Sequence, residues 1–286
     1  MLCLALFSGC QPHADTAALN VSVDYLVNGQ DLLTDSMQYV NEADNHFMIN
    51  EIQWFLSHLE LQDANGTWTA IGEPEAIRYF DTHLPETHQI HFDGLPAGSY
   101  QALRFTFGLD ENDNVTGRFP NPPEMNMFWP EPLGGGYHYM KLNGRWLNPE
   151  QELQPLNIHL GVGQNPELTE FYPNHFTVTL PINLTLKASH VNSLRLIMVI
   201  DNWFRGPNLF DFNQFGSTIM QNQEAQRLLK ENGQDVFRVA LESSLVDDIA
   251  RPMKTIAKAA SPKPHFYTKK NMGKLLSDLT RKKKKP

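Results

Sequence analysis

The sequence predicts an all-β fold, an antiparallel β-sandwich with long loops and one short helix near the C-terminus. Three observations support this class. Short apolar runs alternate with polar residues at a period of two, which is the pattern of half-buried strands. Turn dipeptides such as Asn-Gly separate the runs, and 19 prolines and 18 glycines are spread along the 286 residues. Many short strands divided by turns are typical of antiparallel sandwiches.

The clearest alternations lie in residues 20–27 and 49–61. The turn signals Asn28-Gly29 and Asn65-Gly66 follow them, so each run predicts the first strand of a hairpin. Residues 217–232 carry apolar groups at helical spacing and precede a glycine, which predicts the short helix. The remaining strands are expected at 68–71, 90–92, 102–107, 137–142, 156–160, 174–180, 194–200 and 237–239.

Charge divides the chain into an acidic body and a basic tail. The formal net charge is −9, yet residues 243–286 hold 12 Lys and Arg against 3 Asp and Glu, or +9. The rest of the chain holds 11 against 29, or −18. Such a body repels the phosphate backbone, so nucleic-acid binding is excluded as its function. We therefore expect one β-sandwich domain at 20–240 and a disordered basic tail at 241–286.

Both cysteines, Cys3 and Cys10, lie at the extreme N-terminus. The segment Phe7-Ser8-Gly9-Cys10 ends an apolar run and resembles the bacterial lipobox, whose cysteine is acylated after cleavage. We expect residues 1–19 to be a lipoprotein-type signal and linker, with Cys10 anchoring the protein to a membrane; the alternative is an ordinary apolar N-terminus. Gln11 fits sorting to the outer membrane of a Gram-negative cell. The mature chain would then have no free thiol, so a soft metal would need His, Met or aromatic ligands.

Residues 125–146 gather two Trp, two Tyr, one His and three Met around a glycine triplet at 134–136. The glycines allow a sharp turn or a close backbone approach. In the strand expected next, alternation places His138 on the face of Met140 and Leu142. His138 is therefore either a core histidine or a metal ligand held on a rigid element.

Two further histidines, His159 and His175, lie on the non-core faces of the consecutive strands expected at 156–160 and 174–180. Pairing of these two strands would bring the rings within metal-bridging distance, with His138 as the third ligand. Imidazole suits copper in either oxidation state. The alternative is that these are solvated surface histidines.

Asp110, Asn112 and Asn114 have the spacing of the first half of a calcium loop. Val115 occupies the position that needs glycine, and Asn121 the position that needs glutamate. We therefore expect a solvated loop here.

Several motifs together suggest a family. They are Ala102-Leu-Arg-Phe-Thr-Phe-Gly-Leu-Asp110, Met127-Phe-Trp129, Gly135-Gly-Tyr-His-Tyr-Met-Lys-Leu-Asn-Gly144 and His159-Leu-Gly161. In this order they resemble the MbnP-like proteins, over about residues 20–240.

The resemblance implies a β-sandwich exported to the periplasm or cell surface, often as a lipoprotein. Family members include copper-binding proteins, and some carry a tryptophan that a dihaem partner of the cytochrome c peroxidase type oxidises to kynurenine. Trp129 best matches that tryptophan, and His138 and His159 fall in the family's Gly-Tyr-His and His-x-Gly positions. Many relatives have a second tryptophan two residues on, where this chain has Glu131.

These observations predict a lipid-anchored copper-binding protein of the periplasm or cell surface that acquires or carries the metal and is not itself an enzyme. Its ligands would be His138, His159 and His175, with Trp129 adjacent and a dihaem peroxidase-like protein as partner. Two alternatives remain at this point. One is a β-sandwich module that binds a peptide or carbohydrate without metal, and the other is a redox enzyme that uses the same copper.

Overall fold

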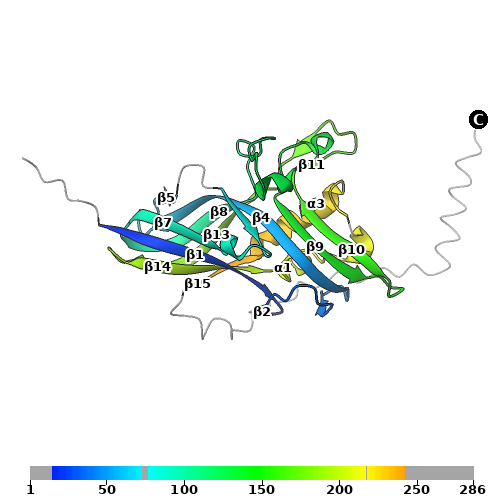
Figure 1. Ribbon diagram of the computed structural model, residues 1–286, viewed down its shortest axis with the longest axis horizontal. Helices are drawn as coiled ribbons and strands as arrows, with labels where there is room; N and C mark the ends of the chain where they lie inside the picture. The colour runs from blue at the N-terminus through cyan, green and yellow to red at the C-terminus, as the bar shows by residue number, and fades with distance from the viewer. Residues whose placement is uncertain (1–14, 73–76, 217, 242–286) are drawn as a thin grey trace, which may run out of the picture. The chain divides into compact units, whose positions relative to one another are not determined.

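The computed structural model describes residues 15–72, 77–216 and 218–241, and these belong to one compact unit. Two main sheets pack as a sandwich, so the predicted all-β class is confirmed (Figure 1). The first strand begins at Thr16, four residues before the expected start of the domain. The predictions for Cys10 and for the tail from 242 onward lie outside the described residues.

The first sheet has five strands. In order across the sheet they are β15 (Phe237–Leu241), β14 (Val191–Val199), β1 (Thr16–Val27) and β2 (Gln30–Asp31), while β7 (Gln89–Pro96) also pairs with β1. The hairpin predicted at Asn28-Gly29 is present, with φ of +53° and +73° at these two residues.

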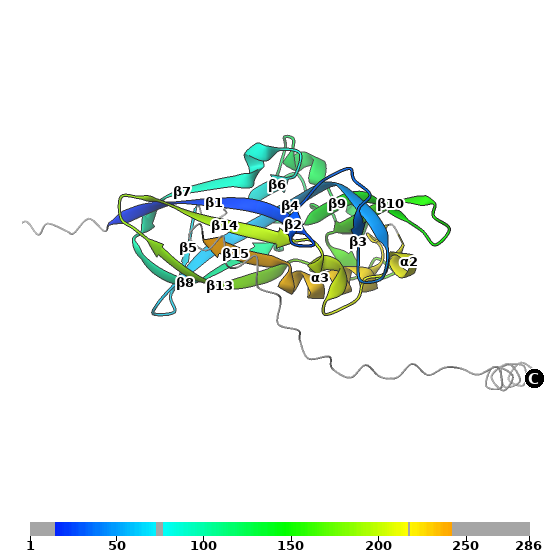
Figure 2. The same cartoon turned by 90° about the horizontal axis from the view of Figure 1, so that it is seen from below.

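One strand pair departs from the antiparallel prediction. β1 and β14 run parallel, from Ala18 opposite Val191 to Leu26 opposite Val199 (Figure 2). Parallel neighbours need a long crossover, and here the chain between them builds the whole second sheet. Alternation along a strand reports burial and carries no information about direction, so the sequence pattern could not show this pairing.

The second sheet has eight strands around a long central one. Its order is β10 (Leu153–Leu160), β9 (Met140–Leu147), β4 (His46–Asp63), β8 (Gly98–Phe107) and β13 (Phe176–Leu186); β3 (Tyr39–Val40), β5 (Trp68–Ala70) and β6 (Arg78–Asp81) also pair with β4. A two-stranded ribbon joins β11 (Gly163–Gln164) to β12 (Phe171–Tyr172). β10 and β13 therefore occupy opposite edges.

Aromatic side chains join the two sheets. Trp54 on β4 stacks on Phe80 and Phe107, with ring centroids 4.6 and 5.9 Å away. It also packs on Phe237 of the first sheet at 5.2 Å. The indole Nε1–H of Trp54 donates a hydrogen bond to the Tyr25 hydroxyl at 3.0 Å, so its one polar atom is satisfied inside the core.

The predicted helix is confirmed in a shorter form, as α3 (Gln223–Asn232). It starts late because the Asn222 side chain accepts a hydrogen bond from Ala225 N and caps the first turn. α3 lies beside β10 (Figure 1). The other helical turns are α1 (Asn202–Arg205), α2 (Phe212–Phe215) and 3₁₀ turns at Pro85–His88, Glu124–Met127, Glu131–Leu133 and Gly233–Asp235. Of the helices in the described part of the chain, none has the length and apolarity of a membrane span.

Candidate metal centre

A short backbone ladder around the glycine triplet brings Trp129 and His138 together. Trp129 N donates to Gly136 O at 2.8 Å, and His138 N donates to Met127 O at 2.6 Å. Phe128 and Tyr137 form the bridge between these two bonds. The two segments thus pair like strands, so residues nine positions apart in sequence become neighbours in space.

Glycine is required at the end of this loop. Gly136 has a φ of +78°, a region that side chains rarely adopt. A Cβ there would also overlap the Asn114 amide, whose Oδ1 accepts a hydrogen bond from Tyr137 N at 2.8 Å. The sharp turn and the close approach expected of the triplet are both present.

Trp129 is completely buried. Its Nε1–H donates to Leu133 O at 2.9 Å, and its ring centroid lies 4.7 Å from that of His138, edge-on. The benzo part of the indole lies over Gly161, where a Cβ would come within 2.5 Å of the ring. The space that Gly161 opens beside His159 is thus filled by Trp129.

The hydrogen bonds of His138 fix its tautomer. Its Nδ1 lies 2.9 Å from Met127 O, and because a carbonyl only accepts, Nδ1 carries the proton. The other nitrogen, Nε2, is then unprotonated and carries a free lone pair. It is buried and has no hydrogen-bond partner. A buried imidazole nitrogen left in this state is suited to bind a metal ion.

His159 is oriented by Asn143. The Asn143 amide donates through Nδ2 to Glu51 Oε2 at 3.3 Å, which turns its Oδ1 toward His159. His159 Nε2 lies 2.8 Å from that oxygen and is therefore the protonated nitrogen. His159 consequently offers Nδ1 as its free lone pair, and the carboxylate behind the amide holds the ring in place.

The two imidazoles are close neighbours in an edge-on arrangement. Their ring centroids are 5.0 Å apart at an interplanar angle of 85°, a spacing that one ion with metal–nitrogen bonds of about 2 Å can bridge. Burial, reinforced by the neighbouring His159, lowers the pKa of His138 to about 3. Burial, reinforced by Lys141, lowers the pKa of His159 to about 4. At neutral pH both rings are therefore uncharged, and each keeps one unprotonated nitrogen that can bind a metal ion.

His138 does not lie on the face that alternation predicted. β9 starts only at Met140, because the preceding residues pair with the Met127–Trp129 segment instead. His159 is opposite Lys141 in the β9–β10 register, so it lies on the sheet face away from the buried Met140. The His138 ring joins His159 there, although the expectation that His138 is buried is correct.

His175 lies elsewhere. The expected pairing of its strand with that of His159 is wrong, because β13 and β10 are at opposite edges of the sheet. His175 Nε2 is 3.3 Å from Glu111 Oε1, and its ring is 6.1 Å from that of Tyr139. Among the described residues, it forms no three-ligand group with the other two histidines.

Comparison with known proteins agrees with this architecture. A family model described as MbnP matches residues 16–221. The chain belongs to the MbnP family. Its fold is similar to that of MbnP from Methylosinus trichosporium, at a TM-score of 0.51 and 14% identity, over 79% of this chain and 99% of the other. A comparison with curated proteins found no match.

The sequence did not predict the roles of two side chains that support the site in this MbnP-family chain. Asn143 belongs to a turn-like Asn-Gly pair that lies inside β9 instead of ending it. Gln226 on α3 is fully buried, and its amide donates to His159 O at 2.7 Å and faces Gly161 N at 3.4 Å. The only sequence signal for Gln226 is a polar residue beside the apolar stripe of the helix.

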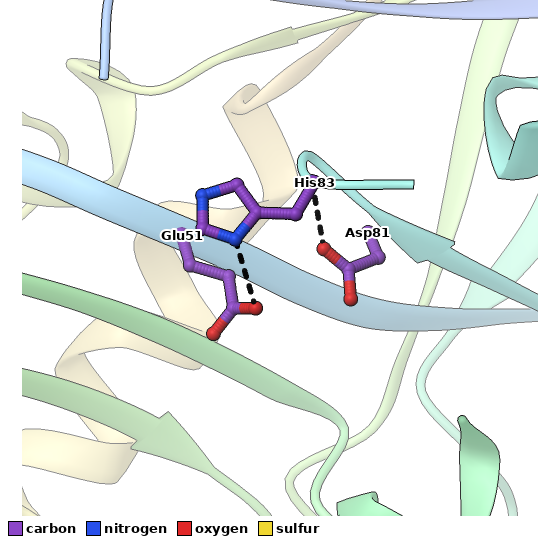
Figure 3. A group of neighbouring side chains, drawn as sticks. All are labelled: Glu51, Asp81 and His83. Carbon is purple, nitrogen blue, oxygen red and sulfur yellow. Dashed lines mark hydrogen bonds and ion pairs between the residues drawn. The ribbon is translucent and has the colours of Figure 1, made fainter. Parts of the chain in front are cut away.

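A second polar group lies on β4, at the end of β6 and in the turn that follows it. It consists of Glu51, Asp81 and His83, whose potential ligand atoms are within 4.8 Å of one another (Figure 3). His83 Nδ1 is 3.4 Å from Glu51 Oε1. Both Asp81 oxygens already accept hydrogen bonds, from His83 N on one side and from Tyr79 and Gln53 on the other. These hydrogen bonds therefore stabilise the sheet next to His159, which Glu51 supports through Asn143.

The lowered pKa values predict acid sensitivity of the metal-free protein. In unfolded chains these histidines titrate near pH 6.5, so below that pH the unfolded state binds more protons than the folded state. The stabilisation is complete above about pH 6.5 and is lost as pH falls through the folded pKa values, about 4 for His159 and about 3 for His138. Replacing His159 by Asn should reduce the pH slope of the unfolding free energy by up to about 1.4 kcal/mol per unit. Urea titrations at several pH values measure it, and equal slopes would contradict the assignment.

Gly161→Ala should drive a methyl group into the Trp129 ring and destabilise the protein by about 1–3 kcal/mol. A double-mutant cycle with Trp129→Phe tests the cause, because Phe lacks the benzo ring that Gly161 contacts. In that background Gly161→Ala should cost clearly less. Additive costs, measured by chemical denaturation, would show that the two residues are not coupled.

Proposed function

We propose that this MbnP-family protein binds copper through His138 and His159, beside Trp129. The observation that carries the proposal is the buried, unpartnered Nε2 of His138, 5.0 Å ring to ring from a second neutral imidazole. Burying such an atom without a hydrogen bond is unfavourable, and a bound ion removes that penalty.

The donor set favours copper over hard cations. Imidazole nitrogen is a ligand for copper and zinc, whereas magnesium and calcium prefer oxygen. Two neutral ligands place no negative charge on the ion, which suits the singly charged cuprous state. Trp129 and the buried Met127 line one side of the site with apolar groups, and such a lining raises the cost of added charge. We assign the protein to copper acquisition or carriage, with no catalytic role.

The proposed location is the periplasm or cell surface of a Gram-negative bacterium, with a lipid on Cys10 as the membrane anchor. Support comes from the lipobox-like Phe7-Ser8-Gly9-Cys10 segment and from the placement of both cysteines before the domain. A thiol-free domain suits an oxidising compartment. Without thiolate groups in the domain, histidines would be the copper ligands.

Trp129 is the proposed substrate of a dihaem, cytochrome c peroxidase-like partner that oxidises it to kynurenine. Hydrogen peroxide at the haems would accept the electrons, water would supply the added oxygen, and C2 of the indole would leave as formate. Its closeness to His138 means that such a modification would change the atoms beside the metal. Because Trp129 is completely buried, the partner would remove electrons through the intervening protein and not by direct contact. The neighbouring Phe128 is 45% exposed and offers an aromatic group at the surface.

Single alanine variants test the ligand set. His138→Ala and His159→Ala should each weaken copper binding at least tenfold, since each removes one of two ligands. His175→Ala is the matched control and should retain the wild-type affinity. Competition against a cuprous chelator gives the affinities, and circular dichroism confirms folding. Loss of copper in the His175 variant alone, or in none, would contradict the proposal.

Oxidation of Trp129 is tested separately. Protein isolated from cells that contain the dihaem partner should yield a peptide around Trp129 with the mass of the kynurenine form, whereas cells without the partner should give the unmodified mass. Trp203, which is equally buried, serves as the internal control and should stay unmodified. An unmodified Trp129 in both cell types would contradict this part of the proposal and leave copper binding untouched.

A further inference from the structure

We propose that His58, Asp110 and Asp113 form a second metal site, separate from the histidine pair, for a divalent transition ion of the zinc type. Their potential ligand atoms all lie within 4.8 Å of one another. One imidazole and two carboxylates, with a water in the fourth position, make a donor set that zinc accepts.

A bulge in β4 directs His58 toward this site. The register between β4 and β8 shifts between Ser57 and Glu60, and His58 has a φ of +52°. A bulge re-aims a side chain that a regular strand would point elsewhere. The ring therefore leaves the sheet and meets the loop that follows β8.

Each carboxylate uses one oxygen to interact with its own loop and directs the other oxygen toward the proposed metal. Asp110 Oδ1 accepts hydrogen bonds from Asn112 N at 2.9 Å and Asp113 N at 3.0 Å. Asp113 Oδ1 lies 3.3 Å from an Arg118 nitrogen. In each residue the other oxygen, Oδ2, points toward His58. Ligands are commonly oriented in this way, with one atom anchored and one free to bind.

The spacing fits a tetrahedral ion. His58 Nε2 is 3.3 Å from Asp110 Oδ2 and 3.0 Å from Asp113 Oδ2. Ligands of a tetrahedral zinc with bonds of about 2 Å are about 3.3 Å apart. The two carboxylate charges also match the charge of a divalent ion.

Buried atoms without hydrogen-bond partners provide an independent indication. Asp113 is 4% exposed, and neither its Oδ2 nor the Nε2 of His58 makes a hydrogen bond, although the two atoms are close. The two atoms are therefore within ion-pair distance, but the angles between them do not permit a hydrogen bond. Two lone-pair atoms that converge in this manner are placed for a shared cation.

Each carboxylate of the proposed site keeps its Oδ2 directed at His58 Nε2, at 3.3 Å from Asp110 and 3.0 Å from Asp113. In the Glu51, Asp81 and His83 group, by contrast, both oxygens of the buried carboxylate are already hydrogen-bonded.

Zinc titration of the chelator-treated full-length chain tests the proposal. The His159→Ala variant serves as the parent, so that the histidine pair does not compete for the probe. His58→Asn removes the imidazole with a residue that tolerates positive φ, and it should weaken zinc binding at least tenfold. Asp110→Asn keeps the oxygen that accepts the backbone hydrogen bonds and should have a similar effect. Zn²⁺ should raise the melting temperature of the parent and not of these variants.

His83→Asn, in the hydrogen-bonded group, is the matched control and should bind zinc as the parent does. Unchanged affinity in both His58→Asn and Asp110→Asn would overturn the proposal, as would a loss in His83→Asn instead. Stabilisation by Ca²⁺ equal to that by Zn²⁺ would overturn the assigned class of metal, because calcium prefers oxygen ligands alone. Circular dichroism establishes that each variant is folded.

Discussion

The hydrogen bonds that close the loop around the glycine triplet position Trp129 and His138 at the candidate copper site. Trp129 N donates to Gly136 O at 2.8 Å and His138 N donates to Met127 O at 2.6 Å. They fix the Trp129 ring over Gly161 and present His138 to His159. The ladder holds the backbone of Trp129 and of the candidate ligand His138 side by side, although neither residue lies in a strand of the main sheets.

The sheet supplies the rigid half of the site. His159 stands on β10, and its ring is held by Asn143 and, behind it, Glu51. The backbone of the same residue is held by Gln226 from α3. Three separate elements thus restrain one imidazole, while the loop restrains the other. Because both rings are already held in place, less side-chain conformational entropy would be lost when an ion binds.

The sequence predicted the strands well because alternation reports directly which residues are buried. It could not report which strands are neighbours. His159 lies on β10 and His175 immediately precedes β13, yet these two strands of the second sheet occupy opposite edges. Alternation in the strand expected at 137–142 predicted that His138 would lie among apolar groups, but the face it occupies depends on a pairing with Met127 that no local pattern reveals. Gln226 was missed for the same reason, because its role depends on long-range contact.

The two candidate sites share a loop. Asn114 N bonds to Asp110 O at 2.8 Å, and the Asn114 side chain in turn holds Tyr137 N, next to His138. Thr116 Oγ1 accepts from Gly136 N at 2.8 Å. An ion held by the carboxylates would therefore bind to the same loop that supports the glycine ladder. This loop is a direct structural link between the two candidate sites.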